Sequence, residues 1–185
     1  VLVWTNFAPE NNVALGNVLA DYVDGGGRVV VATFVGFHMA GSAGRLFGTG
    51  YNPFVEVDSP YPAPGCLGAH DAASALFDGV AVICANQYRG DWMAASLDTG
   101  ATLLASWNDG KPLVGINAAG NVLNVALFPN VAYYHHATGD YAQLFRNALA
   151  FRVAEAPAAV PEPGTLALLG LGLLGFAASY RRKQT

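Results

Sequence analysis

The chain ends in a charge-free apolar stretch that is followed directly by a cluster of cations. The stretch reads TLALLGLGLLGFAASY, and Arg181, Arg182 and Lys183 come immediately after it. A helix over residues 164–180 would be about 25 Å long, which is at the short limit for crossing a hydrocarbon core of about 30 Å. Cations next to such a helix favour the cytoplasmic side of a membrane. The pattern predicts a C-terminal transmembrane helix and a basic cytoplasmic tail over residues 181–185.

The alternative for this stretch is a helix buried in the core of a domain, which its length alone would allow. The stretch has no polar face, lies at the end of the chain and stops at three cations, and these features favour the membrane. The preceding residues 154–163 read AEAPAAVPEP. Their three prolines, with no apolar periodicity, predict a stiff linker between the helix and the body of the protein.

The tail resembles the PEP-CTERM sorting signal of Gram-negative bacteria that produce exopolysaccharide. Pro161, Glu162 and Pro163 form the triplet, and the Gly/Leu/Ala-rich helix and the Arg-rich cluster follow it in the expected order. The resemblance implies export, recognition of the triplet by an exosortase-type membrane protease, cleavage nearby, and delivery to the cell surface or extracellular matrix. It makes the exosortase and the membrane the implied partners.

The composition describes a globular body. Of the 185 residues, 53% are hydrophobic and 12% are charged, which excludes a disordered chain. The formal net charge of −4 and a pI of about 5.4 exclude a basic nucleic-acid binder. The acidic residues concentrate before the tail, so the chain divides into an acidic body and a basic end. We expect one domain over residues 1–153.

The body begins with an alternation of strands and helices. Residues 1–5 form a short apolar run typical of a strand covered on both faces. Asn11 or Asn12 is placed to cap a helix that runs to about Asp24, and the following glycines end it. Residues 28–34 read as a second buried strand, so the segment predicts a βαβ unit with parallel strands.

The rest of the body is less regular. Residues 35–53 and 58–70 are rich in glycine or proline and read as surface loops. Short apolar runs predict strands over residues 102–107, 112–118 and 122–128, and the short turns between them predict antiparallel hairpins. A last helix is expected over residues 140–153, with Thr138 as its candidate cap.

The body resembles the class I glutamine-amidotransferase-like fold, especially trehalose-utilisation-type domains. The resemblance rests on LADYVDGGGRVVV with the following GFHMAG, on SALFDGV, on GKPLVGINAAGNVLNVALFP and on TGDYAQLFRNALAF. It implies an α/β fold with a flavodoxin-like parallel sheet, helices on both faces and a partly antiparallel C-terminal portion. That family has further elements before the segment matching residues 1–5, and no export signal precedes Val1. We therefore expect an N-terminally truncated chain, the alternative being a complete chain exported by another route.

The sequence offers no catalytic residue that we can assign. The amidotransferase nucleophile would follow the strand at residues 28–34, where the sequence has no cysteine. His38, in the loop after that strand, is the candidate ligand-site residue because ligands bind near the carboxyl ends of parallel strands. His70 and Asp71 form either a polar pair or a simple cap. His135 and His136 lack a metal-binding spacing, and we expect no metal or cofactor.

Two function classes follow. The first is a non-catalytic surface or matrix protein; the second is an extracellular carbohydrate-active enzyme or carbohydrate-binding domain acting on exopolysaccharide. Loop aromatics would stack on sugar rings in the second class, or simply pack the loops onto the domain; they are Phe47, Tyr51, Phe54, Tyr61, Tyr88, Trp92, Tyr133 and Tyr134. Cys66 and Cys84 allow either one disulfide or two free thiols.

Overall fold

The computed structural model describes residues 1–5, 7–33, 44–54, 64–87, 89–90, 97–129 and 137–152. The chain divides into two compact units, Val1–Arg152 and Val153–Thr185, and all of the described residues belong to the first. The following paragraphs concern that unit alone.

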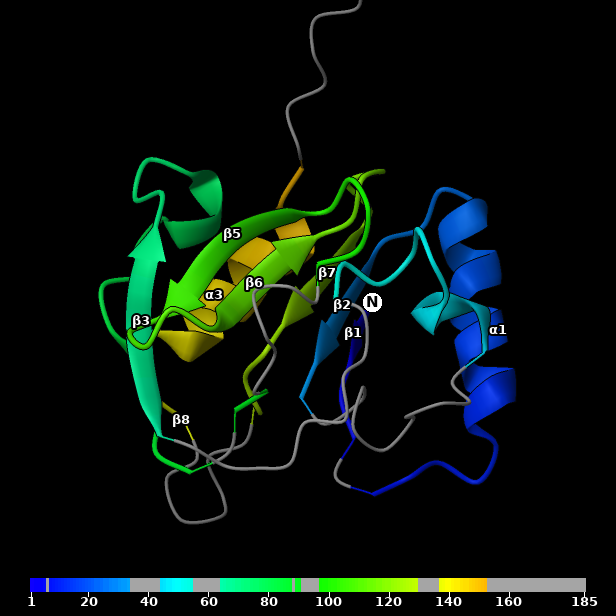
Figure 1. Cartoon of the computed structure of the whole chain (residues 1–185), viewed down its shortest axis with the longest axis horizontal. Coiled ribbons are helices and arrows are strands. Elements are labelled where there is room, and N and C mark those ends of the chain that lie inside the picture. The colour runs from blue at the N-terminus through cyan, green and yellow to red at the C-terminus, as the bar shows by residue number, and fades with distance from the viewer. Residues whose placement is uncertain are drawn as a thin grey trace, which may run out of the picture. The chain divides into compact units, whose positions relative to one another are not determined.

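The unit is a mixed α/β domain built on one eight-stranded sheet with the order β1-β2-β7-β6-β5-β3-β4-β8 (Figure 1). In chain order, the elements are β1 (Leu2–Val3), α1 (Asn12–Asp24), β2 (Val29–Ala32), the 3-10 helix η1 (Arg45–Phe47), β3 (Gly65–His70), the 3-10 helix η2 (Ala75–Phe77), β4 (Ile83–Ala85), β5 (Thr102–Trp107), β6 (Pro112–Ile116), β7 (Val122–Val125), β8 (Ala137–Gly139) and α3 (Tyr141–Ala150).

The parallel part of the sheet is smaller than a flavodoxin-like fold requires. Only β1, β2 and β7 are parallel neighbours among the described strands, with Leu2 opposite Val30 and Val30 opposite Leu123. The remaining pairs are antiparallel. The expectation of a mainly parallel sheet was therefore wrong, because the short turns between β5, β6 and β7 can join only antiparallel strands.

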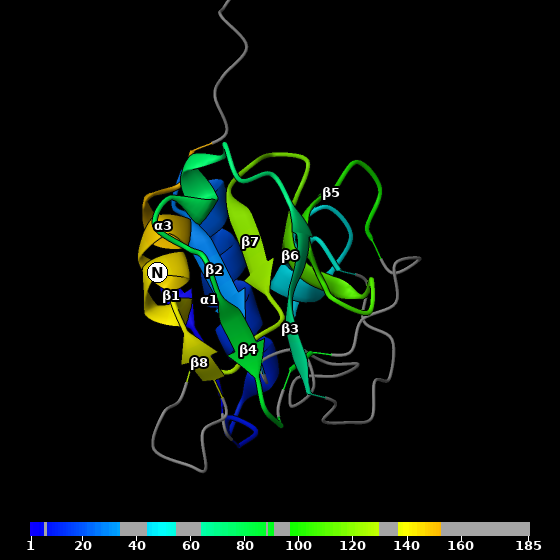
Figure 2. The same ribbon diagram turned by 90° about the vertical axis from the view of Figure 1, so that its left-hand side faces the viewer.

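Helices cover both faces of the parallel part, as expected. Successive residues of β2 point to opposite faces: Val29 and Val31 pack with Leu19, Ala20 and Val23 of α1. Val30 and Ala32 instead join the larger core that contains three buried residues of α3, namely Leu144, Phe145 and Ala148. The sheet curls, so that β4 and β8 also contribute to this larger core (Figure 2).

Local signals set the bounds of α1. The Asn11 side chain accepts a hydrogen bond from the Ala14 N–H at 2.9 Å, which satisfies one of the free donors at the helix start. At the other end, the N–H groups of the three glycines turn back to carbonyls of the last turn, and Gly26 adopts a φ of 86°. Both the Asn11 cap and the glycine stop are confirmed.

Two further expectations were wrong, one for residues 65–70 and one for Thr138. Residues 65–70, read as part of a loop, form β3, because antiparallel pairing with β4 and β5 outweighs the poor strand propensity of its glycines. Thr138 does not cap α3 but belongs to β8, and Asp140 occupies the N-cap position. The three strands over residues 102–128 and their antiparallel hairpins are confirmed.

In the part of the chain that the structure describes, no helix is both long and apolar enough to cross a membrane. The expected transmembrane helix over residues 164–180 lies outside the described residues.

Candidate functional site

The carboxyl ends of β1, β2 and β7 meet at one edge of the sheet because these strands are parallel. We call it the carboxyl edge; ligands of open α/β sheets bind outside it. Just beyond β2, the Thr33 N–H donates to the Leu127 carbonyl at 3.3 Å. Leu127 also forms a β-bridge with Arg89, and the Gly90 N–H donates to the Ala126 carbonyl at 2.9 Å. Segments that follow β2, β4 and β7 therefore come together here.

The structure describes the chain up to Thr33, just after β2, but it does not describe His38, the candidate ligand-site residue. The chain leaves β2 at the carboxyl edge through Thr33. His38 lies outside the described residues, and so do His135 and His136. Among the residues that are described, no group of three or more His, Cys, Asp or Glu side chains is arranged to hold a metal ion.

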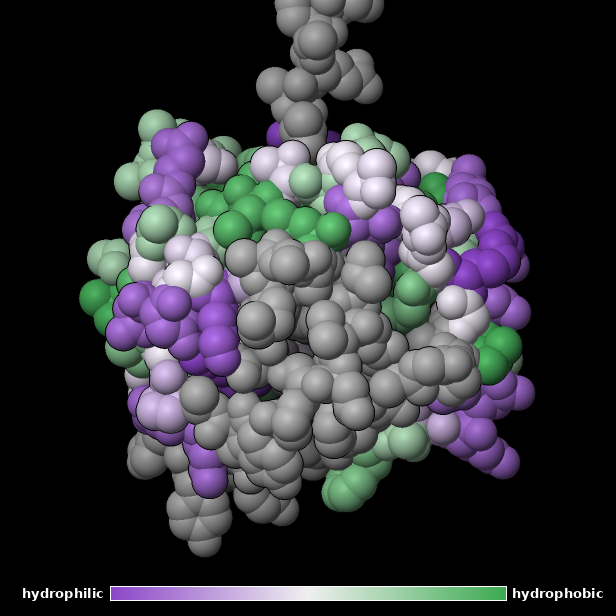
Figure 3. Space-filling model, in the orientation of Figure 1, coloured by the Kyte–Doolittle hydropathy of each residue, from purple (hydrophilic) through white to green (hydrophobic). Residues whose placement is uncertain are grey.

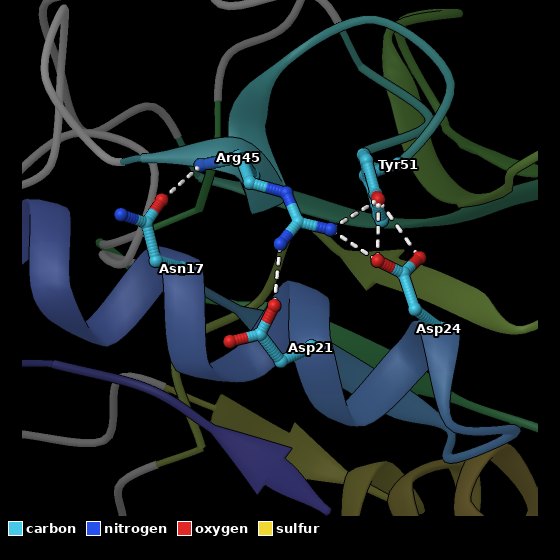
Figure 4. A network of polar contacts seen from close by, with 5 residues as sticks. All are labelled: Asn17, Asp21, Asp24, Arg45 and Tyr51. Carbon is cyan, nitrogen blue, oxygen red and sulfur yellow. Dashed lines mark hydrogen bonds and ion pairs between the residues drawn. The ribbon is translucent and has the colours of Figure 1, made fainter.

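The described part of the chain that begins at Gly44 forms a polar clamp on α1 (Figure 4). Arg45 forms ion pairs with Asp21 and Asp24 of that helix, and its Nη2 donates to the Tyr51 hydroxyl at 3.0 Å. The Tyr51 hydroxyl donates in turn to Asp24 at 2.8 Å. The Arg45 backbone N–H donates to the Asn17 side chain at 2.9 Å. Hydrophilic residues accordingly gather along the flank where α1 lies (Figure 3).

Gly44 allows this clamp to form. It adopts a φ of 65°, and a Cβ atom on it would lie 2.4 Å from the Val13 carbonyl oxygen and 2.6 Å from Asn17 Oδ1. The hydrogen bonds to Tyr51 and Asp21 raise the pKa of Arg45. The clamp thus fixes one end of the segment that carries His38, while Thr33 fixes the other.

A second polar cluster, centred on Arg89, was missed by sequence analysis. The Arg89 side chain is 1% exposed and forms an ion pair with Asp109, with Nη1 donating to Oδ1 at 3.1 Å. Its guanidinium carbon lies 5.3 Å from the centre of the Trp107 ring, within cation–π range. The Arg89 hydrogen bond lowers the pKa of the Asp109 carboxyl. No periodicity or motif distinguishes Arg89 from a solvated loop arginine.

A disulfide lies beside this cluster. Cys66 of β3 and Cys84 of β4 are cross-strand partners, and their sulfur atoms are 2.06 Å apart. The Cys66 N–H and carbonyl also form hydrogen bonds with Asn108, at 3.2 and 2.8 Å. This resolves the alternatives left open by the sequence in favour of the disulfide. Neither of the chain's two cysteines is a free thiol.

The remaining candidates have local roles. The Asp71 carboxylate accepts a hydrogen bond from the Ala73 N–H at 2.9 Å, so it stabilises the turn before η2. It does not cap the helix, because Ser74 occupies the N-cap position of η2. The His70 ring packs on Phe77, with ring centres 4.8 Å apart. Of the loop aromatics that are described, Phe54 is 1% exposed, and Phe47 and Tyr51 pack on the α1 core. Loop packing, rather than sugar stacking, accounts for these three.

The sorting residues Pro161, Glu162 and Pro163 and the cations Arg181, Arg182 and Lys183 lie outside the described residues. Comparison with family models matches residues 159–183 to the PEP-CTERM protein-sorting motif. The motif supports an exported protein that is anchored in a membrane before release and processed by an exosortase, itself a membrane protein. Nothing in this comparison supports the amidotransferase-like resemblance of the body. Comparison with curated proteins gives no match.

Proposed function

We propose that the chain is a bacterial surface or extracellular-matrix protein whose body is delivered by exosortase cleavage near Pro161, Glu162 and Pro163. The match of residues 159–183 to the sorting motif carries this proposal. In it, the body comprises residues 1–153, and residues 154–163 form the linker that presents the triplet to the protease. Residues 164–180 cross the membrane, and residues 181–185 remain in the cytoplasm.

Electrostatics supports this orientation. Arg181, Arg182 and Lys183 would each have to be desolvated to cross the hydrocarbon core, which costs several kcal/mol per ion by order of magnitude. The body is acidic and lacks such a cluster. The three cations therefore hold the C-terminus inside while the body faces outward.

The disulfide also supports a location of the body outside the cytoplasm. Disulfides persist in oxidising compartments such as the periplasm and the cell surface, and are rare in the cytosol. Cys66 and Cys84 are joined, so neither supplies a thiolate for glutaminase-type chemistry. We propose that the body is a domain without that catalytic activity, serving as the cargo of the sorting tail.

Co-expression with an exosortase tests the proposal. The wild-type chain should move from the membrane fraction to the released fraction only when the protease is present. Replacement of Pro161, Glu162 and Pro163 by alanine should leave the chain membrane-bound, because the recognised triplet is lost. Mass spectrometry of the released body should place its new C-terminus near residue 161.

The matched control carries Glu155→Ala and Pro157→Ala, which change the same residue types in the linker ahead of residues 159–183. It should be released like the wild type. Equal release of the triplet variant and the control would overturn the sorting assignment, as would release that is independent of the exosortase.

A further inference from the structure

The strand β1 leaves one side of its backbone open at the edge of the sheet. The Val30 N–H donates to the Val1 carbonyl at 2.8 Å, and Leu2 is the register partner of Val30. The backbone groups of successive strand residues face opposite sides, so the N–H and carbonyl of Leu2 point away from β2. Among the residues that the structure describes, no strand pairs with β1 on that side. The edge therefore offers hydrogen-bonding groups to a further strand.

The sequence of β1 does not protect this edge. Natural edge strands are commonly blunted by lysine, by proline or by a bulge. Residues 1–5 read VLVWT, without a charge or a proline, and the described pairing of β1 with β2 runs in a regular register. An edge with these properties is a template for pairing with another chain.

Apolar side chains border the edge on both faces of the sheet. Val3 packs against the core formed with α1, and strand alternation places Val1 on the same face, where it is 52% exposed. Leu2 packs against the core formed with α3, and the same alternation places Trp4 on that face, where it is 49% exposed. Exposed apolar side chains that gather in one place mark an interaction surface.

The two flanks of α1 differ in polarity. Asp21 and Asp24 lie on the flank that contacts η1, where Arg45 pairs with both. The 3-10 helix η1 packs toward β7, because Leu46 and Val122 belong to the same core. The acidic flank of α1 therefore faces away from β1, and Figure 2 shows β1 and the cyan η1 on opposite sides of α1.

The opposite flank of α1 is apolar and exposed. Val18 and Tyr22 lie one helical turn apart and are 63% and 46% exposed. The sheet order is β1-β2-β7 and α1 packs on β2, so this flank faces the β1 side. We call Val1, Trp4, Val18 and Tyr22 the β1 surface. Because about half of each large side chain is exposed, the β1 surface offers on the order of 400 Å² of apolar area.

We propose that the β1 surface pairs with the same surface of a second copy of this chain across a two-fold axis. The two β1 strands run antiparallel, with Leu2 of each copy opposite Trp4 of the other, because both residues direct their backbone groups outward. This register joins residues of the same face, so the two sheets become one continuous sheet and the two α1 helices lie on the same side of it. Closed, self-complementary contacts of this kind are the commonest in homodimers.

Area and charge both fit a second copy. A standard interface buries about 800 Å² per partner, slightly more than half of it non-polar, which is close to the apolar area of the β1 surface. The two α1 flanks that face each other do not bring carboxylates together, because Asp21 and Asp24 lie on the other flank with Arg45. The contact belongs to the body alone and does not depend on the proposed exosortase processing.

Sedimentation velocity of the full chain in a density-matched non-ionic detergent tests the proposal over a range of protein concentrations. We expect an equilibrium between monomer and dimer. Trp4→Lys and Val18→Lys should each weaken dimerisation by about tenfold or more, because each places an unpaired charge inside the contact. Val18→Lys changes an exposed helix residue, so it keeps the test valid if the Trp4 variant folds poorly.

Val82→Lys is the matched control, because Val82 is an equally exposed valine, at 55%, that lies before β4 and outside the β1 surface. It should dimerise like the wild type. A wild type that stays monomeric at every concentration would overturn the proposal. A dimer that persists unchanged in both the Trp4 and the Val18 variant would also overturn it, and would assign the association to the apolar tail or to another surface.

Hydrogen exchange supplies a second measurement, at the strand itself. Dimerisation should slow the exchange of the Leu2 and Trp4 amides, because their N–H groups become paired with the second copy. Mass spectrometry of peptides that cover β1 measures this exchange at low and high protein concentration. The slowing should appear in the wild type and in Val82→Lys, and should be lost in Val18→Lys. Dimerisation without slower exchange in β1 would show that the copies associate elsewhere.

Discussion

Gly65 provides the space that the guanidinium of Arg89 occupies: a Cβ atom on residue 65 would lie 2.4 Å from Arg89 Nη1. An arginine end group normally swings away from such a contact, but this one is held by Asp109 and stacked over Trp107. The glycine at the start of β3 and the buried arginine after β4 therefore depend on each other.

Gly65→Ala should destabilise the body by about 1–3 kcal/mol, the usual range for overpacking a fixed interior. Urea unfolding followed by circular dichroism measures the change. Gly25→Ala is the control, because its φ is −74° and its Cβ would meet the nearest atom, the Asp21 carbonyl oxygen, at 3.4 Å. The control should stay within about 0.5 kcal/mol of the wild type. Equal stability of both variants would show that the Arg89 side chain can move away from a Cβ atom on residue 65 without a cost in stability.

Reduction of the Cys66–Cys84 disulfide should lower the free energy of unfolding by about 3 kcal/mol. The bond spans 18 residues, and a cross-link of that length restricts the unfolded chain by about this amount in the loop-entropy account. Urea midpoints with and without dithiothreitol measure the effect. A Cys66→Ser, Cys84→Ser double variant should match the reduced protein and ignore the reductant. An insensitive wild type would mean that the cysteines are not joined in solution.

Asp109→Asn should lower the free energy of unfolding of the body and reduce the decrease of that free energy at acidic pH. The Arg89 hydrogen bond holds the pKa of Asp109 below its ordinary 3.8. Its stabilisation is therefore present above pH 3.8 and is lost as the pH falls below that value. At pH 7 we expect a loss of about 1–3 kcal/mol, because a buried guanidinium loses its charged partner.

The Asp109 prediction is checked by urea unfolding between pH 2 and pH 7. Asp140 also contributes to the loss of stability at acidic pH, because the N–H groups of Val82 and Ala81 lower the pKa of its carboxyl. The single Asp109 variant should therefore keep part of the acid slope, and adding Asp140→Asn should remove more. An unchanged slope in the Asp109 variant would contradict the ion pair as its source.

Arg45→Met should have a small global effect and a clear local one. The ion pairs of Arg45 are exposed, with 46% of its side chain accessible, so we expect only a small loss in the free energy of unfolding. Hydrogen exchange of amides in residues 45–51 should accelerate, because the clamp on α1 is opened. Arg146→Met serves as the exposed control and should leave that exchange unchanged. Slow exchange retained in the Arg45 variant would show that Gly44 and Asn17 are enough to hold residues 45–51 on α1.

Local chemistry made part of the fold predictable. The Asn11 cap and the glycine stop of α1 involve residues that lie close together in the chain, so a short stretch of sequence is enough to predict them. The turn at residues 108–111 is equally local: Gly110 takes a φ of 85°, and the Trp107 N–H donates to the Lys111 carbonyl at 2.7 Å. Such signals place elements along the chain but do not choose their neighbours.

Reading the amino-acid sequence alone was enough to predict α1, β2, the hairpins over residues 102–128 and the sorting motif at residues 159–183. Three features became visible only in the folded domain: β3 is a strand, Cys66 is joined to Cys84, and Arg89 is buried against Trp107. The difference lies in how far apart in the chain the interacting residues are. Caps, turns and apolar periodicity are short-range effects, whereas strand pairing, disulfide geometry and the burial of a charge depend on partners that only the folded chain brings together.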